Sequence, residues 1–89
     1  MSWKFNNVIP NLGTITEGPC WDGEKLLFSN IANNRILSYN MKNNITEEVF
    51  KDTGEANGLN FNIKGELFAC EGGRRRIARY NKDGSKDTI

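Results

Sequence analysis

Two segments of the chain follow one pattern: EGPCWDGEKLLFSNIANNRILSYN at residues 17–40 and NGLNFNIKGELFACEGGRRRIARYN at residues 57–81. Each begins with an acid or amide before glycine and continues through an aromatic residue and a short apolar run to an Arg-Ile pair. A shift of forty residues places Glu17 on Asn57, Trp21 on Phe61, and Leu27-Phe28 on Leu67-Phe68. We interpret the chain as a tandem repeat.

The second halves of the two copies align only when the shift between them is one residue larger. Arg35-Ile36 matches Arg76-Ile77 and Tyr39-Asn40 matches Tyr80-Asn81 only with a shift of forty-one residues. We attribute the slip to a single-residue insertion in a turn, residues 31–34 against 71–75.

Each repeat has the pattern of four short strands separated by turns. Thirteen Asn and nine Gly supply turn residues, and no segment carries a sustained apolar stripe at helical spacing. The first copy predicts strands at Gly18–Trp21, Lys25–Ile31, Arg35–Tyr39 and Ile45–Phe50. The second predicts strands at Gly58–Phe61, Glu66–Cys70 and Arg75–Tyr80, and a last strand that has barely begun at Ile89. An antiparallel four-stranded meander repeating every ~40 to 45 residues is typical of a β-propeller blade.

We therefore predict an all-β protein with about two four-stranded antiparallel blades. Residues 1–13 are expected to hold an N-terminal closing strand (Trp3 to Ile9), residues 14–53 the first blade and residues 54–89 an incomplete second blade. Propellers close with typically 4 to 8 blades. Two blades alone leave apolar faces and strand edges uncovered. We expect either the N-terminal fragment of a larger propeller or a short form that assembles with other chains.

Composition excludes several functional classes. A net charge of +1 disfavours a nucleic-acid or anionic-membrane partner, and no apolar run approaches the length of a membrane span. The absence of His excludes imidazole catalysis and His-based zinc sites within this chain. Two cysteines fifty residues apart are expected to be free, packed thiols. With no apolar leader at the N-terminus, we expect a cytoplasmic protein.

The motifs resemble one family in particular. Thr16-Glu17-Gly18-Pro19-Cys20-Trp21-Asp22, followed by Leu27–Ile31 and Asn34-Arg35-Ile36, looks like the opening blade of the gluconolactonase, regucalcin (senescence marker protein) and luciferin-regenerating enzyme family. The second copy follows the same order from Ala56-Asn57-Gly58-Leu59 to Asp83-Gly84. The resemblance covers nearly the whole chain.

The resemblance implies a six-bladed propeller that hydrolyses lactones or related esters with a divalent cation in its central channel. That cation is usually Ca²⁺, with Zn²⁺, Mg²⁺ or Mn²⁺ as alternatives. By position, Glu17 would be a metal ligand and Asn57 would contact the substrate or metal-bound water. The other protein ligands would come from later blades. Some sugar-acid lactonases have a basic residue two positions before this Asn, where the chain has Glu55. This departure concerns the expected specificity for aldonolactones and leaves the expected fold unchanged.

The residues themselves allow two interpretations of these positions. Glu17 and Asn57 begin equivalent innermost strands, which converge on the axis of a radial array, and oxygen donors suit a hard cation. Alternatively, Glu17 is an exposed turn carboxylate and Asn57 a turn amide before Gly58. No residue is an obvious general base.

Two further features have structural interpretations. Glu71 is expected in a plain loop after the second strand of its blade. The basic cluster Arg74-Arg75-Arg76 is expected on an edge or solvated face, because it lacks the aromatic platform of a nucleic-acid site.

Two functions follow from the sequence. The first is the N-terminal part of a metal-dependent lactonase, inactive alone, with a small lactone or ester as its partner. The second is a non-catalytic module of two blades per chain, three copies of which close a six-bladed ring.

Overall fold

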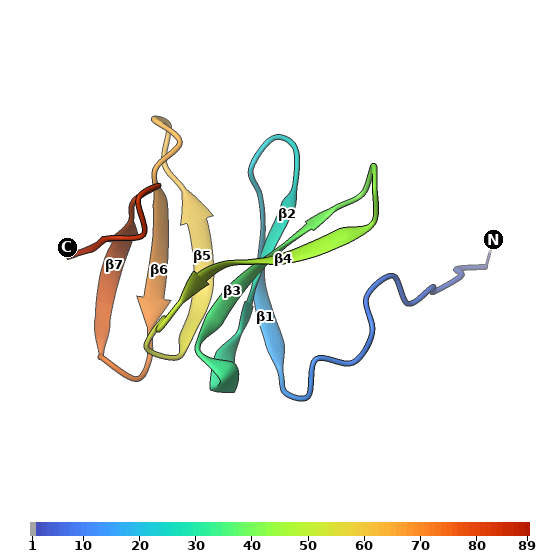
Figure 1. Ribbon diagram of the computed structural model, residues 1–89, viewed down its shortest axis with the longest axis horizontal. Coiled ribbons are helices and arrows are strands. Elements are labelled where there is room, and N and C mark those ends of the chain that lie inside the picture. Colours follow the sequence, from blue (N-terminus) through green and yellow to red (C-terminus); the bar gives the residue numbers. More distant parts are fainter. Residues whose placement is uncertain (1) are drawn as a thin grey trace.

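The computed structural model describes residues 2–89 and contains two four-stranded antiparallel sheets (Figure 1). The first sheet has the strand order β1-β2-β3-β4, formed by Thr16–Trp21, Leu26–Asn30, Arg35–Asn40 and Ile45–Lys51. The second has the order β5-β6-β7-β8, formed by Ala56–Phe61, Leu67–Glu71, Arg76–Tyr80 and Lys86–Thr88. A short 3-10 helix, Ile31–Asn33, connects β2 to β3. The predicted pair of antiparallel meanders is confirmed, and the last strand precedes Ile89 instead of starting there.

The strand register revises the alignment of the two repeats. β2 pairs Leu26 with Tyr39, and β6 pairs Leu67 with Tyr80. Both strands of this hairpin are therefore shifted by forty-one residues, so the match of Leu27-Phe28 to Leu67-Phe68 is wrong. The error arises because three consecutive bulky apolar residues in β2 allow two alignments with the two in β6.

The extra residue lies in a different turn from the one predicted. β1 pairs Trp21 with Leu26, and β5 pairs Phe61 with Leu67, so the first strands keep the forty-residue shift. The insertion therefore falls between the first two strands of the second sheet, in residues 62–66 against 22–25, and not after β6.

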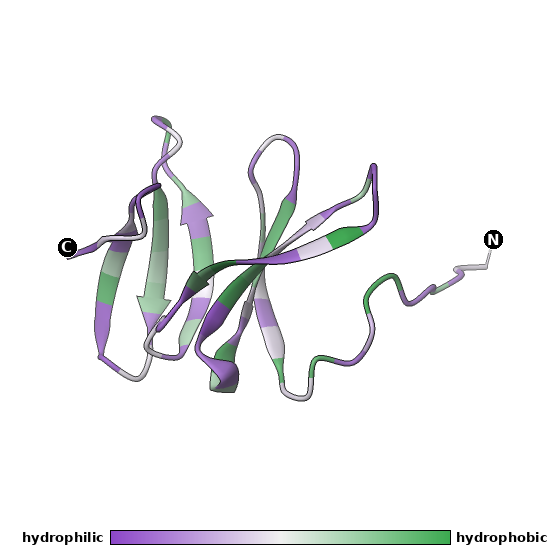
Figure 2. Ribbon diagram, viewed as in Figure 1, coloured by the Kyte–Doolittle hydropathy of each residue, from purple (hydrophilic) through white to green (hydrophobic). Residues whose placement is uncertain are grey.

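The main hydrophobic core lies between the two sheets. Leu27 and Ile36 of the first sheet pack with Leu59, Leu67 and Ala78 of the second, all buried. Figure 2 shows hydrophobic segments along the strands of both sheets. At the edge of this core the rings of Phe50 and Tyr80 meet edge to face with centroids 5.1 Å apart. Burial of these side chains is the principal term holding one sheet against the other.

The opposite face of the first sheet is covered by the N-terminal segment. Phe28, Leu37 and Tyr39 form a second buried cluster against Ile9 and Leu12. Residues 2–15 form no strand, so the predicted closing strand over Trp3–Ile9 is not formed. A strand needs a neighbouring edge to pair with. The segment meets the sheet through side chains and single hydrogen bonds, such as that from the Ile31 N–H to the Ile15 carbonyl at 3.2 Å. Met1, part of the predicted segment 1–13, lies outside the described residues.

The second sheet contains a buried carboxylate that the sequence placed in a loop. Glu71 is the last residue of β6 and is 1% exposed. Its Oε1 accepts hydrogen bonds from Arg76 Nε at 2.7 Å and Arg74 Nη1 at 3.1 Å. Its Oε2 accepts one from the Tyr80 hydroxyl, which also bonds the Thr53 carbonyl at 3.1 Å. Two of the clustered arginines are thus engaged in an ion pair and do not form a free solvated face.

The contacts of Glu71 with the two arginines and Tyr80 determine the charge states of Glu71 and Tyr80. Burial alone would raise the pKa of Glu71, but hydrogen bonds from Arg76, Tyr80 and Arg74 outweigh it and hold the pKa below its ordinary value. Burial and the neighbouring Glu71 carboxylate raise the pKa of Tyr80. Glu71 is therefore charged, and Tyr80 is a neutral donor at neutral pH.

Replacing Glu71 by Gln should lower the free energy of unfolding at pH 7 by about 2–3 kcal/mol, because two guanidinium groups lose a buried anionic partner. The equivalent position of the first sheet is Asn30, whose amide oxygen accepts from Arg35 Nε at 2.8 Å, so an amide is compatible with the fold. Urea denaturation followed by circular dichroism measures the loss.

The free energy of unfolding should depend on pH differently in wild type and in Glu71→Gln. Because the pKa of Glu71 is lowered by folding, its contribution is complete above the ordinary value of about 4.3 and is lost as the pH falls through the folded-state pKa. Wild type should therefore lose stability more steeply than Glu71→Gln between about pH 5 and pH 3. Hydrogen bonds from Ser85 and Asn81 lower the pKa values of Asp83 and Asp87 in both proteins, so the difference isolates Glu71. Parallel stability curves would contradict the assignment.

Candidate functional site

The two innermost strands, β1 and β5, approach each other closely at Gly18. Gly18 has φ +60°, and a Cβ at this position would lie 2.0 Å from the Asn57 carbonyl oxygen. The Ser29 hydroxyl, fully buried, donates to the same carbonyl at 2.7 Å. The structure thus brings the backbone of the Glu17-Gly18 pair against that of Asn57.

Glu17 and Asn57 occupy equivalent positions in the two sheets. Thr16 pairs with Asn30, the last residue of β2, and Ala56 pairs with Glu71, the last residue of β6. Both ladders become irregular close to these pairs, between Glu17 and Cys20 in β1 and between Ala56 and Leu59 in β5. Glu17, which pairs with Ser29, is the last regularly paired residue before the irregularity of β1, and Asn57 is the first residue within that of β5.

Both side chains are exposed and available to a ligand. The only hydrogen bond that the Glu17 carboxylate accepts from the described residues comes from the Gly18 N–H at 3.3 Å. The Asn57 side-chain amide makes no hydrogen bond within residues 2–89. Both are oxygen donors with unused coordination capacity.

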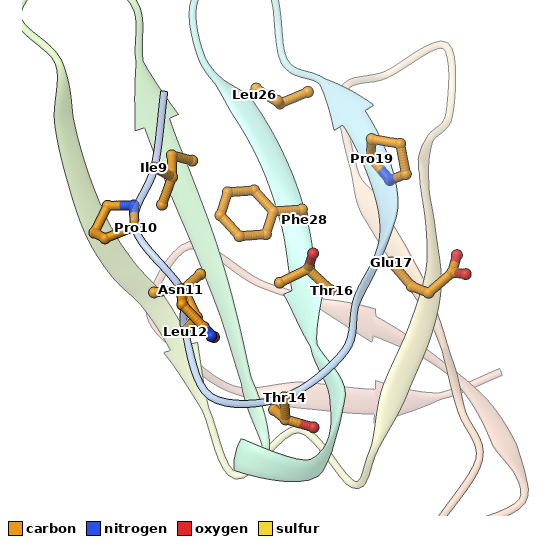
Figure 3. Close-up of a pocket in the computed structure, with 10 residues that line it drawn as sticks. All are labelled: Ile9, Pro10, Asn11, Leu12, Thr14, Thr16, Glu17, Pro19, Leu26 and Phe28. Atoms are coloured by element: carbon orange, nitrogen blue, oxygen red, sulfur yellow. The ribbon is translucent and has the colours of Figure 1, made fainter. Parts of the chain in front are cut away.

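An apolar cleft of about 410 Å³ adjoins Glu17. It lies between the N-terminal segment, including Ile9 and Leu12, and the covered face of the first sheet, including Leu26 and Phe28. Figure 3 shows the Glu17 carboxylate directed away from these apolar side chains. Glu17 therefore marks the rim of the cleft, and its charge faces the other way.

The described residues form no large cluster of side chains that could bind a metal ion. Among residues 2–89, no three Asp, Glu, Cys or His side chains lie together in a way that could hold a metal ion. Within the described chain, the candidate site is limited to one carboxylate, from Glu17, and one amide, from Asn57. Within the same residues, no helix has the length and apolar character that a membrane crossing needs.

The two thiols have different environments. Cys20 is partly buried against the core between the sheets, and burial raises its pKa. Cys70 is exposed, so the prediction of a packed thiol is wrong for this residue. It lies on the face of the second sheet that is turned away from the first, where no described residue covers it.

Sequence reasoning did not identify Ser29 as part of the site. It is the one hydroxyl in the apolar run of β2, and a buried hydroxyl requires a hydrogen-bond partner. That requirement could have marked Ser29 as a residue that holds a backbone carbonyl, here the carbonyl of Asn57.

Comparison with solved structures identifies the class of fold. A gluconolactonase from Xanthomonas campestris matches 85% of this chain and 26% of its own length, with a TM-score of 0.79 and 28% identity. A second structure, a provisionally assigned gluconolactonase, matches 84% of this chain and 27% of its own length, with a TM-score of 0.74 and 27% identity. Virginiamycin B lyase from Staphylococcus aureus, at 20% identity and a TM-score of 0.72, shows the fold alone. No protein-family model and no curated protein matches the chain.

These matches define an all-β protein composed of propeller-type blades. The predicted resemblance to gluconolactonases is confirmed at the level of structure, and it supports a lactonase-type family. The chain spans about a quarter of the length of the structures that it matches.

The close approach of β1 and β5 leads to a stability prediction. Gly18→Ala should destabilise the protein by about 3 kcal/mol, because a Cβ combines a left-handed backbone with an overlap against the Asn57 carbonyl. The matched control is Gly58→Ala, where the nearest atom to the new Cβ is Cys70 Sγ at 3.9 Å. That control should change stability by less than about 1 kcal/mol. Equal losses in urea denaturation of the two variants would contradict the role given to Gly18.

Proposed function

We propose that this chain supplies two blades of a lactonase-type hydrolase that acts on lactones or related esters with a divalent cation, the remaining blades coming from outside these 89 residues. The observation that carries the proposal is the placement of Glu17 and Asn57 at equivalent positions of adjacent innermost strands. The similarity to gluconolactonases supports the reaction class.

The donor set fits one part of a Ca²⁺ site. Calcium takes 6 to 8 oxygen ligands. The chain offers the exposed Glu17 carboxylate and the exposed Asn57 amide, and the hydrogen bond to the carboxylate leaves most of its lone pairs free. Glu17 would hold the cation, and Asn57 would orient the substrate beside it. A divalent cation polarises an ester carbonyl and lowers the pKa of a bound water.

The residues of this chain would contribute position and charge. The close approach at Gly18 and the hydrogen bond from Ser29 to the Asn57 carbonyl hold β1 and β5 in place against each other. The side chains of Glu17 and Asn57 therefore project from a well-fixed backbone. Asn57 can donate and accept hydrogen bonds, which suits a lactone oxygen. The chain contains no His, and the general base is assigned to residues outside it.

Calcium binding tests the part of the proposal that this chain carries. Wild type should show a rise in thermal midpoint with millimolar CaCl₂, since a ligand that binds only the folded state stabilises it. Glu17→Gln should lose most of this rise. Glu24→Gln, which neutralises an exposed turn carboxylate close by in sequence, should retain it.

Two results of the calcium experiment would contradict the proposal. One is an equal calcium response in wild type and Glu17→Gln, and the other is no response up to ~10 mM, well above the range of weak calcium modules. Lactone hydrolysis by the 89-residue chain as a monomer would also contradict it, because the proposed site is incomplete without further blades. A pH-stat assay with a panel of simple lactones, including an aldonolactone, measures this activity.

A further inference from the structure

Asn57 and Gly58 form the only Asn-Gly pair in the sequence. Both residues are exposed on β5, and neither has a partner in the register with β6, which passes from Ala56 directly to Leu59. The Asn57 side-chain amide makes no hydrogen bond within residues 2–89. This side chain is therefore unrestrained beside the one backbone nitrogen that can attack it.

An asparagine followed by glycine loses its side-chain amide without an enzyme. Base removes the proton of the Gly58 amide nitrogen, which attacks Asn57 Cγ and closes a cyclic imide. The Cγ–Nδ2 bond breaks, and Nδ2 takes up a proton and leaves as ammonia. Water then opens the imide. Addition of water at Cγ leaves aspartate, whereas addition at the backbone carbonyl carbon of residue 57 leaves isoaspartate, in which the main chain passes through the former side chain.

The surroundings of Gly58 leave room for the imide. Only Cys70 Sγ lies within 4 Å of the position that a Cβ on Gly58 would occupy, at a distance of 3.9 Å. The amide nitrogen of a glycine is also the least hindered in the backbone, because no Cβ stands beside it. Neither the chain itself nor its neighbours therefore block the attack on Asn57 Cγ.

The peptide unit between Asn57 and Gly58 is held from the neighbouring sheet. The Ser29 hydroxyl donates to the Asn57 carbonyl at 2.7 Å, and Gly18 packs against the same carbonyl. This carbonyl and the Gly58 N–H belong to one planar unit. The imide ring imposes its own ψ on residue 57, so the unit must rotate out of its strand conformation. That rotation breaks the Ser29 hydrogen bond and leaves a buried hydroxyl unpaired.

We propose that Asn57 is a site of spontaneous deamidation and that Ser29 sets the rate of the reaction in the folded protein. The product replaces an uncharged amide, which donates and accepts hydrogen bonds, by a carboxylate, which only accepts them. The new charge lies on the strand that contacts Gly18, the residue after Glu17. Under the proposed function, on which this last consequence rests, the modified chain offers a cation two carboxylates and loses the amide that orients the substrate.

Peptide mapping by mass spectrometry tests the proposal on the folded chain, incubated in calcium-free buffer at mildly alkaline pH. Trypsin releases residues 52–64, which contain Asn57, Asn60 and Asn62 together. The last two are internal controls, because neither precedes glycine and the Oδ1 atom of each accepts a backbone hydrogen bond. Asn57 should be converted to aspartate and isoaspartate while the other two remain amides. Gly58→Ala should slow the conversion about tenfold, because its Cβ hinders the attacking nitrogen.

Ser29→Ala tests the second part of the proposal. It should accelerate the conversion about fivefold, which corresponds to the ~1 kcal/mol of a typical hydrogen bond. Ser38→Ala is the matched control, since Ser38 is also a buried serine of the first sheet but does not bond residue 57, and it should react at the wild-type rate. Circular dichroism and urea denaturation verify that the compared variants are folded during the incubation.

The proposal is overturned if Asn57 stays an amide while Asn60 or Asn62 is converted, or if Gly58→Ala reacts as fast as wild type. Equal rates in Ser29→Ala and Ser38→Ala would overturn the role of Ser29. The assay uses neither calcium nor a lactone, so its failure is distinct from failure of the proposed function.

Discussion

The close approach of the first strands of the two sheets is the constraint on which the rest of the structure depends. With Gly18 against the Asn57 carbonyl, β1 and β5 lie nearer than side chains on both strands would permit. That spacing places Leu27 and Ile36 in van der Waals range of the facing sheet, where Leu67 and Ala78 are buried. Glu17, the residue that we propose as a metal ligand, immediately precedes the glycine at which the strands meet.

The linker between the sheets is held by both of them. The Thr53 N–H donates to the Asn34 carbonyl at 3.3 Å, and the Glu55 N–H donates to Asn34 Oδ1 at 2.8 Å, both on the first sheet's side. On the other side, Arg74 binds Asp52 at 2.8 Å and the Tyr80 hydroxyl binds the Thr53 carbonyl. Three linker residues have positive φ, including the non-glycine residues Asp52 and Glu55. Such conformations persist only where surrounding contacts determine them, and this network supplies those contacts.

The approximate positions of most strands and the existence of a repeat were predictable from sequence because they depend on local chemistry. Asn and Gly at turns and short apolar runs between them define strands without reference to the rest of the molecule. The alignment of the two repeats was harder to predict, because Leu26, Leu27 and Phe28 can be matched in two ways to the apolar pair in β6. Only hydrogen-bonded pairing across the hairpin decides between them.

Tertiary contacts account for the features that sequence reasoning missed. Glu71 resembles a loop residue beside two glycines, and its burial depends on Arg74 and Arg76, which were interpreted separately from it. The N-terminal segment has strand-forming residues but no edge to pair with. At the candidate site, the positions of Glu17 and Asn57 follow from the repeat, whereas the Ser29 contact with the Asn57 carbonyl needs the packing of one sheet on the other.

The repeated pair of residues at the ends of β2 and β6 shows why the candidate site is incomplete within this chain. In one sheet the acceptor is Asn30 and in the other Glu71, and each accepts from the first arginine of the next strand. These acceptors are buried and already bonded, so they are not available to a cation. Glu17 and Asn57 on the first strands, by contrast, are exposed oxygen donors, one for each sheet. A hard cation that takes 6 to 8 oxygen ligands must then obtain most of its ligands from water or from additional sheets. Under the proposed function, completing the propeller and completing the cation site are therefore one requirement.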